Sequence, residues 1–149
     1  MTNLKAGDKA PDFSIPNQNG DAISLSDFKG KKLVLFFYPK ASTPGCTAEA
    51  CNLRDNIDRF RDQGYEILGA SADSPKRQSN FKNKYDLPYD LLADEDHELL
   101  KAYQVWGPKK FMGREYDGIH RTTFVIDENG IISDVIQKVK TKEHTAQIL

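Results

Sequence analysis

The residues most able to do chemistry in this chain are its two cysteines, Cys46 and Cys51, which lie five positions apart. A cysteine attacks electrophiles as the thiolate, so its reactivity depends on neighbours that stabilise a negative charge. Cys46 falls in or beside the first turn of an expected helix, where unpaired backbone N–H groups and the positive end of the helix dipole provide that stabilisation. The sequence therefore predicts that Cys46 is the reactive thiol.

The spacing of the two cysteines limits what they can do together. Five steps along an ideal helix rise about 7.5 Å and turn through about 500°, which places the two Cα atoms roughly 8 to 9 Å apart. A disulfide usually needs Cα atoms within about 7 Å. Either the pair never bonds, or the first turn of the helix must unwind. The simplest alternative is a pair of ordinary buried cysteines on one helix face.

Two neighbours of Cys46 carry hydroxyl and carboxyl groups. Thr43 can offer its hydroxyl near the Cys46 sulfur, or it can cap the helix that follows. Glu49 lies three residues after Cys46 and is expected to satisfy an early backbone N–H of the helix, as in a capping box. We interpret Glu49 as mainly structural.

The elements around these residues form a strand–helix–strand unit. Residues 33–38 are a continuous apolar run bounded by turn residues, which is typical of a strand buried on both faces. Apolar residues then recur at helical spacing from Ala50 to Phe60, and Gly64 is expected to end this helix. Residues 65–71 are predicted to be a second buried strand, parallel to the first. Ligands of such sheets bind beyond the carboxyl ends of the strands, which is where Cys46 falls.

The remaining segments complete the predicted fold. Asn19-Gly20 between short apolar segments predicts a hairpin near the N-terminus. The other expected elements are a helix opening at Ser74-Pro75, a strand at residues 90–93, a helix at 97–103, a loop at 106–118, a hairpin made by 122–126 and 131–139, and a terminal helix at 141–149. We therefore expect one domain, residues 1–149, built as an α/β sandwich with a mixed sheet.

Composition argues against several classes of protein. The 149 residues include 21 Lys+Arg and 22 Asp+Glu, a net charge of −1, so no basic excess exists to hold nucleic acid. The longest apolar run is far shorter than the roughly 20 residues that span a bilayer. The N-terminus lacks a secretory segment, so we expect a cytoplasmic protein with no membrane partner. The three histidines are scattered singly, so neither a metal site nor a cofactor is expected.

The sequence resembles the peroxiredoxins, and the resemblance rests on a specific motif. Pro39, Thr43 and Cys46 match the family's P-x-x-x-T-x-x-C motif. The fuller stretch, residues 38–47, is similar to the Q-type subfamily, also called the bacterioferritin comigratory proteins. Further counterparts lie along nearly the whole chain, at residues 10–13, 25–28, 69–73, 91–94 and 121–127.

This resemblance implies a thiol-specific peroxidase with a thioredoxin-like fold, in which helices flank a mixed central sheet and an extra β-hairpin lies at the N-terminus. Cys46 would be the peroxidatic nucleophile, which attacks hydrogen peroxide or an organic hydroperoxide and becomes a sulfenic acid, releasing water or an alcohol. Cys51 would be the resolving cysteine, which forms an intramolecular Cys46–Cys51 disulfide. Thioredoxin or a similar dithiol protein would then reduce that disulfide.

The same resemblance implies roles for three further residues. Arg121 matches the family's active-site arginine, whose fixed charge would hold Cys46 as the thiolate and polarise the peroxide. Thr43 would hydrogen-bond the thiolate and the peroxide, and Pro39 would shield the sulfur from bulk water. Catalysis would thus involve Thr43 and Arg121 with the two cysteines, while Pro39, Thr43 and Arg121 would bind the substrate. Q-type proteins are often monomeric, and we expect a monomer here.

Two other functions use the same cysteine pair. A peroxide sensor or redox relay would share the chemistry and differ from a peroxidase in turnover. A thiol–disulfide exchanger is disfavoured, because the four-residue gap between Cys46 and Cys51 is not the C-x-x-C of such enzymes.

The residues around Arg121 are given structural interpretations. His120 is interpreted as structural, and Trp106 and Phe111 as packing residues or loop anchors. Lys109-Lys110 is expected to be a solvated rim, with a docking surface for the reductase as the alternative.

Overall fold

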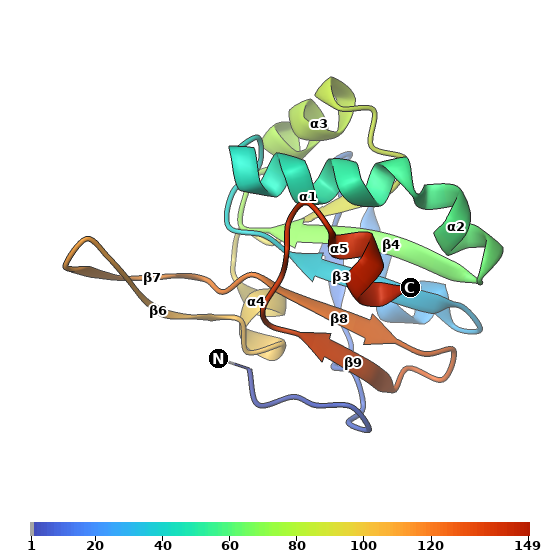
Figure 1. The fold of residues 1–149 in the computed structure, drawn as a ribbon. Coiled ribbons are helices and arrows are strands. Elements are labelled where there is room, and N and C mark those ends of the chain that lie inside the picture. The colour runs from blue at the N-terminus through green and yellow to red at the C-terminus, as the bar shows by residue number, and fades with distance from the viewer. Residues whose placement is uncertain (1) are drawn as a thin grey trace.

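A five-stranded mixed sheet lies at the centre of the computed structural model, which describes residues 2–149 (Figure 1). The sheet separates two hydrophobic layers. Its strands, in spatial order, are β5 (Asp90–Ala93), β4 (Tyr65–Ser71), β3 (Lys32–Phe37), β8 (Thr122–Ile126) and β9 (Ile132–Ile136). The β3–β4 and β4–β5 pairs are parallel, and the β3–β8 and β8–β9 pairs are antiparallel. The predicted mixed sheet and the parallel pairing within the strand–helix–strand unit are both confirmed.

The apolar run of β3 is buried because both of its faces meet a hydrophobic layer. Leu33, Leu35 and Phe37 face one layer, whereas Val34 and Phe36 face the other. The helices that complete these layers are α1 (Pro44–Asp55), α2 (Ile57–Asp62), α3 (Pro75–Lys84), α4 (Glu98–Ala102) and α5 (His144–Ile148). The first three pack with the Val34 face and α4 packs with the Leu33 face. Within residues 2–149, none of these helices has the length and apolar character needed to cross a membrane.

Two hairpins lie outside the central sheet. The N-terminal one, β1 (Ser14–Pro16) with β2 (Ala22–Ser24), confirms the prediction, and a short 3-10 helix, η1 (Leu25–Phe28), follows it. The second, β6 (Trp106–Phe111) with β7 (Arg114–Ile119), projects from the body of the molecule (Figure 1). Its segment was predicted to be a loop, which is wrong. Glycine, proline and exposed polar residues hide the alternation there, and the strands are held by pairing with each other.

The helices also depart from the predicted bounds. The single helix expected to run to Gly64 is broken at Asn56, which lies between α1 and α2 with φ −115° and ψ 15°. The Asn56 side chain donates to the Asn52 carbonyl at 2.8 Å and so competes with helical backbone pairing. The C-terminal helix is shorter than the expected 141–149 and spans only His144–Ile148.

The order of the strands brings two distant segments to one edge of the sheet. The chain leaves β3 at Phe37 and enters α1 seven residues later. Because β8 runs antiparallel to β3, with Thr122 opposite Phe37, β8 begins where β3 ends. Arg121, the residue before β8, is thereby placed beside the first turn of α1, which contains Cys46.

Candidate active site

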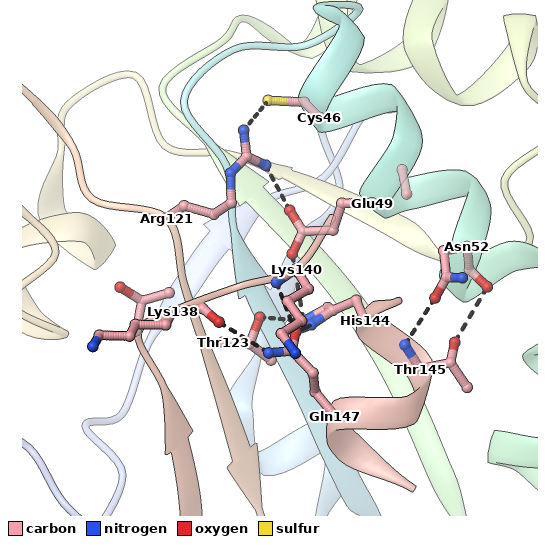
Figure 2. Close-up of polar contacts among 12 residues, drawn as sticks. Cys46, Glu49, Asn52, Arg121, Thr123, Lys138, Lys140, His144, Thr145 and Gln147 are labelled. Carbon is pink, nitrogen blue, oxygen red and sulfur yellow. Dashed lines mark hydrogen bonds and ion pairs between the residues drawn. The ribbon is translucent and has the colours of Figure 1, made fainter. Parts of the chain in front are cut away.

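Cys46 lies in the first turn of α1, at the position that the sequence predicts. The helix begins at Pro44 because proline's fixed φ suits the first helical residue, and it leaves Thr43 extended at φ −84° and ψ 155°. The Cys46 side chain points into the protein, and the residue is 1% exposed. Arg121 donates from Nη2 to Cys46 Sγ at 3.2 Å (Figure 2). The helix terminus and a guanidinium group therefore act on the same sulfur.

The loop between β3 and α1 is fixed from the neighbouring strand. Ala41 donates its backbone N–H to Asp73 Oδ2 at 2.8 Å, and the Ser71 hydroxyl donates to the same oxygen at 2.7 Å. Ser42, in the middle of the loop, has φ 63°, a left-handed conformation that is uncommon for serine. These contacts hold the loop in the shape that presents Cys46.

Arg121 connects Cys46 to a buried carboxyl group. Its Nη1 donates to Glu49 Oε1 at 2.7 Å, and Glu49 is fully buried (Figure 2). Burial by itself lowers the pKa of Arg121, but the facing Glu49 and Cys46 outweigh it and raise the pKa above its ordinary value. Arg121 is therefore a permanent positive charge in the site, and Glu49 competes with Cys46 for it.

Glu49 is the residue whose role sequence reasoning missed. The capping-box prediction is wrong, because the Glu49 carboxyl group points inward to Arg121 and α1 has no side-chain cap hydrogen bond. Burial raises the pKa of Glu49 to about 7, although Arg121 opposes the shift. Its Oε2 lies 3.4 Å from Nε2 of buried His144 on α5. The residue types gave no signal of this contact, because it joins positions 95 residues apart.

Thr43 and Pro39 lie in the segment that joins β3 to α1. Thr43 occupies the N-cap position, but its hydroxyl donates to the Lys40 carbonyl at 2.8 Å instead of capping a helix N–H. The hydroxyl oxygen retains lone pairs that can accept a hydrogen bond. Pro39 is half-buried and lines a cleft together with Trp106 and Lys109.

Cys51 differs from Cys46 in its surroundings. Both cysteines are reduced and both lie within α1, so they are held apart as ideal helix geometry predicts. Cys51 is partly exposed. Burial raises the pKa of its thiol, and the positive charge of Arg54 only partly opposes this shift. At neutral pH Cys51 therefore stays a thiol while the helix is intact.

The residues that the sequence analysis interpreted as packing or rim residues have different surroundings in the structure. Trp106 stacks on the His97 ring with centroids 4.0 Å apart, which confirms its role as a packing residue. Phe111 is 65% exposed, so its interpretation as an anchor is wrong. The solvated-rim prediction is wrong for Lys109, which donates to the Ile119 carbonyl at 2.8 Å and whose pKa burial lowers. Arg121 lowers the pKa of Lys109 further, whereas Cys46 raises it.

Comparisons with known proteins give a consistent result. The model of the AhpC/TSA family matches residues 6–135. The chain is 49% identical to peroxiredoxin Bcp of Escherichia coli K12, covering 100% of this chain and 96% of that protein. It is 46% identical to peroxiredoxin Bcp of Bacillus subtilis 168, covering 98% and 93%.

Solved structures agree with the sequence relatives. Xanthomonas campestris peroxiredoxin Q superposes with a TM-score of 0.86 at 34% identity, covering 91% of this chain and 86% of that one. Peroxidoxin BcpB of Mycobacterium tuberculosis also gives a TM-score of 0.86 at 34% identity, covering 97% and 93%.

Proposed function

The chain belongs to the AhpC/TSA family and is a peroxiredoxin, a thiol peroxidase with a thioredoxin-like fold, and on this premise we propose that Cys46 is the thiol that attacks the peroxide. One observation carries the assignment: the buried Cys46 Sγ accepts a hydrogen bond from Arg121 at 3.2 Å within the first turn of α1. A thiolate is the species that this combination of a helix N-terminus and a guanidinium group stabilises.

The first step transfers one oxygen atom. The Cys46 thiolate attacks the nearer oxygen of hydrogen peroxide or an organic hydroperoxide, and the O–O bond breaks. Cys46 becomes a sulfenic acid, and the departing oxygen takes up a proton and leaves as water or an alcohol. Arg121 stabilises the charge that moves onto the oxygens. The Thr43 hydroxyl accepts the peroxide O–H, and Pro39 limits the access of water to the sulfur.

The second step forms the Cys46–Cys51 disulfide. The Cys51 sulfur attacks the sulfenic sulfur, and water leaves. Because both residues lie within α1, the first turn must unwind before the two sulfurs can meet. Unwinding breaks the contact between Arg121 and Cys46. A thioredoxin-type dithiol protein then reduces the disulfide through a mixed disulfide and returns the helix to its folded form.

The proposed working unit is a single domain, residues 1–149, that acts as a cytoplasmic monomer. The large apolar side chains that are exposed, Phe111, Met112 and Tyr116, all lie on the projecting β6–β7 hairpin. The central sheet has no such side chain exposed among the described residues, so an interface between copies would have to use this hairpin.

Intact-mass analysis after one equivalent of hydrogen peroxide tests the two cysteine roles. The wild-type protein should lose two hydrogens without forming a dimer. Cys51→Ser should gain one oxygen, and Cys46→Ser should keep its mass. A disulfide-linked dimer, or an oxidised Cys46→Ser protein, would overturn the assignment. Sustained peroxide consumption with a thioredoxin system identifies a peroxidase, whereas one stoichiometric oxidation identifies a sensor or redox relay.

A further inference from the structure

A buried polar chain continues from the active site into the C-terminal helix. Arg121 uses one side of the Glu49 carboxyl group, and the other oxygen, Oε2, has no hydrogen-bond partner within residues 2–149. Nε2 of His144 on α5 faces that oxygen at 3.4 Å (Figure 2). Glu49 and His144 are both fully buried. A buried carboxyl oxygen without a partner is costly, so the contact needs an explanation.

The hydrogen bonds of Gln147 determine which nitrogen of His144 carries a proton. The Gln147 amide nitrogen donates to the Lys138 carbonyl at 2.9 Å, and its Oε1 accepts from the Lys140 backbone N–H at 2.9 Å. Its amide orientation is therefore fixed by two backbone groups. Nδ1 of His144 lies 2.8 Å from the same Oε1, which can only accept. Nδ1 therefore carries a hydrogen.

The other nitrogen of a neutral His144 ring must then carry a lone pair. That single lone pair accepts one hydrogen, either from the Thr123 hydroxyl at 2.7 Å or from a protonated Glu49. The same nitrogen faces Glu49 Oε2, and a lone pair opposite an ionised carboxylate is repulsive. One proton held by the pair, either on Oε2 or on Nε2, removes that repulsion.

We propose that Glu49 and His144 share one proton, and that His144 is a positioning residue which, through Glu49, keeps the charge of Arg121 available to the Cys46 thiolate. This inference rests on the proposed role of Cys46. With one shared proton the pair is neutral as a whole, and the positive Arg121 balances the negative Cys46. Without that proton the buried group carries a net negative charge, which disfavours the thiolate.

The surroundings of the pair favour the uncharged arrangement. Burial raises the pKa of Glu49 to about 7 and lowers the pKa of His144, so the proton resides mainly on Glu49. Arg121 before β8 and Tyr89 before β5 act on the pair directly, and Cys46 on α1 acts on Arg121. The pKa of buried Tyr89 is raised well above its ordinary value, mainly by burial, so Tyr89 stays neutral. Arg121 and Cys46 are therefore the charged groups that respond when the Glu49–His144 pair gains or loses its proton.

The test follows the pH dependence of Cys46 alkylation by iodoacetamide, in the Cys51→Ser background. His144→Ala opens space for water beside Glu49, which lets that carboxyl group ionise and neutralise Arg121. We expect the midpoint of alkylation to rise by about one pH unit, so that alkylation at pH values below the parent's midpoint slows about tenfold. Adding Glu49→Gln should return the midpoint to that of the Cys51→Ser parent or below, because an amide cannot ionise.

The matched control disturbs α5 without touching the shared proton. Thr145 donates its backbone N–H and its hydroxyl to Asn52, at 2.8 and 3.2 Å, which fixes α5 to α1. Thr145→Val removes the hydroxyl contact and should leave the midpoint unchanged. An unshifted midpoint in His144→Ala, or a shift that Glu49→Gln does not reverse, overturns the proposal. Alkylation that is absent at Cys46 in the parent would instead overturn the proposed function.

An independent readout is the protonation state of the imidazole ring. Nitrogen NMR of the reduced parent should show His144 neutral at pH 7, with its hydrogen on Nδ1. Blocking Cys46 with iodoacetamide removes the thiolate charge, so the shared proton should be lost at a lower pH, by about one unit. A His144 signal indifferent to the state of Cys46 would contradict the coupling.

Discussion

The two cysteines of α1 occupy contrasting environments on one helix. Cys46 is buried in the first turn, where Arg121 donates to its sulfur at 3.2 Å. Cys51 is partly exposed in the middle of the helix, and burial raises the pKa of its thiol. The same residue type therefore has two chemical roles, because the helix terminus and the hydrogen bond from Arg121 act only on Cys46.

The arginines beside the two cysteines also differ, because their carboxylate partners are buried in one case and exposed in the other. Arg121 pairs with the fully buried Glu49 at 2.7 Å, whereas Arg54 pairs with exposed Asp55 at 2.9 Å. Solvent screens the exposed pair, and such pairs contribute only about 0.2–1 kcal/mol. The comparison teaches that a nearby cation is not enough to activate a thiol; the cation must also donate a hydrogen bond to the sulfur, as Arg121 does to Cys46.

The largest expected effect comes from replacing Arg121 with leucine, and the same replacement at Arg54 serves as the comparison. Arg121→Leu should lower the second-order rate constant for peroxide by about 10²-fold, because it removes the donor to Cys46 and to the developing charge. Arg54→Leu, the matched control, should change that constant less than about threefold. Stopped-flow kinetics with excess peroxide measures both. Equal losses in the two variants would remove the distinction between the two environments.

The next prediction concerns the structural change that joins the two environments. Formation of the Cys46–Cys51 disulfide should unwind the first turn of α1, since the intact helix holds the residues too far apart. Amide hydrogen exchange at residues 46–51 should therefore be at least tenfold faster in the oxidised protein. Residues of β4 serve as the internal control. Unchanged protection at residues 46–51 would show that the disulfide forms without unwinding.

A smaller effect is expected for the pH dependence of stability. The pKa of Glu49 is raised by burial from 4.5 to about 7, so the folded state binds more protons than the unfolded state in this range. The contribution of Glu49 to stability is therefore present below pH 4.5 and is lost as the pH rises to about 7. Glu49→Gln should gain stability relative to the wild type between pH 5 and pH 8, as measured by urea unfolding. A constant difference would show that Glu49 does not titrate in this window.

The smallest effect is expected at Gly45. A Cβ atom there would lie 3.4 Å from Arg121 Nη2, an ordinary contact with the end of a flexible side chain. Gly45→Ala should therefore change the peroxide rate constant by less than about threefold. A loss as large as that of Arg121→Leu would mean that the position of the guanidinium group tolerates no displacement.

Local patterns in the sequence were sufficient for the elements that carry the cysteines. The apolar run of β3 predicts a strand buried on both faces, and the periodicity after it predicts the helix that begins near Cys46. Hairpin β6–β7 was missed because its residues are largely exposed, so no apolar alternation marks its strands. The break at Asn56 was missed because one side-chain contact with the preceding turn decides it.

The amino-acid sequence by itself determined the chemistry, since it encodes a cysteine at a helix N-terminus, a second cysteine too distant for a bond within the intact helix, and the motif of the family. Only the tertiary structure decided the electrostatics. The β3–β8 register places Arg121 against Cys46, and the docking of α5 places His144 against Glu49. Contacts between residues 75 or 95 positions apart depend on strand order and burial, which no local pattern specifies.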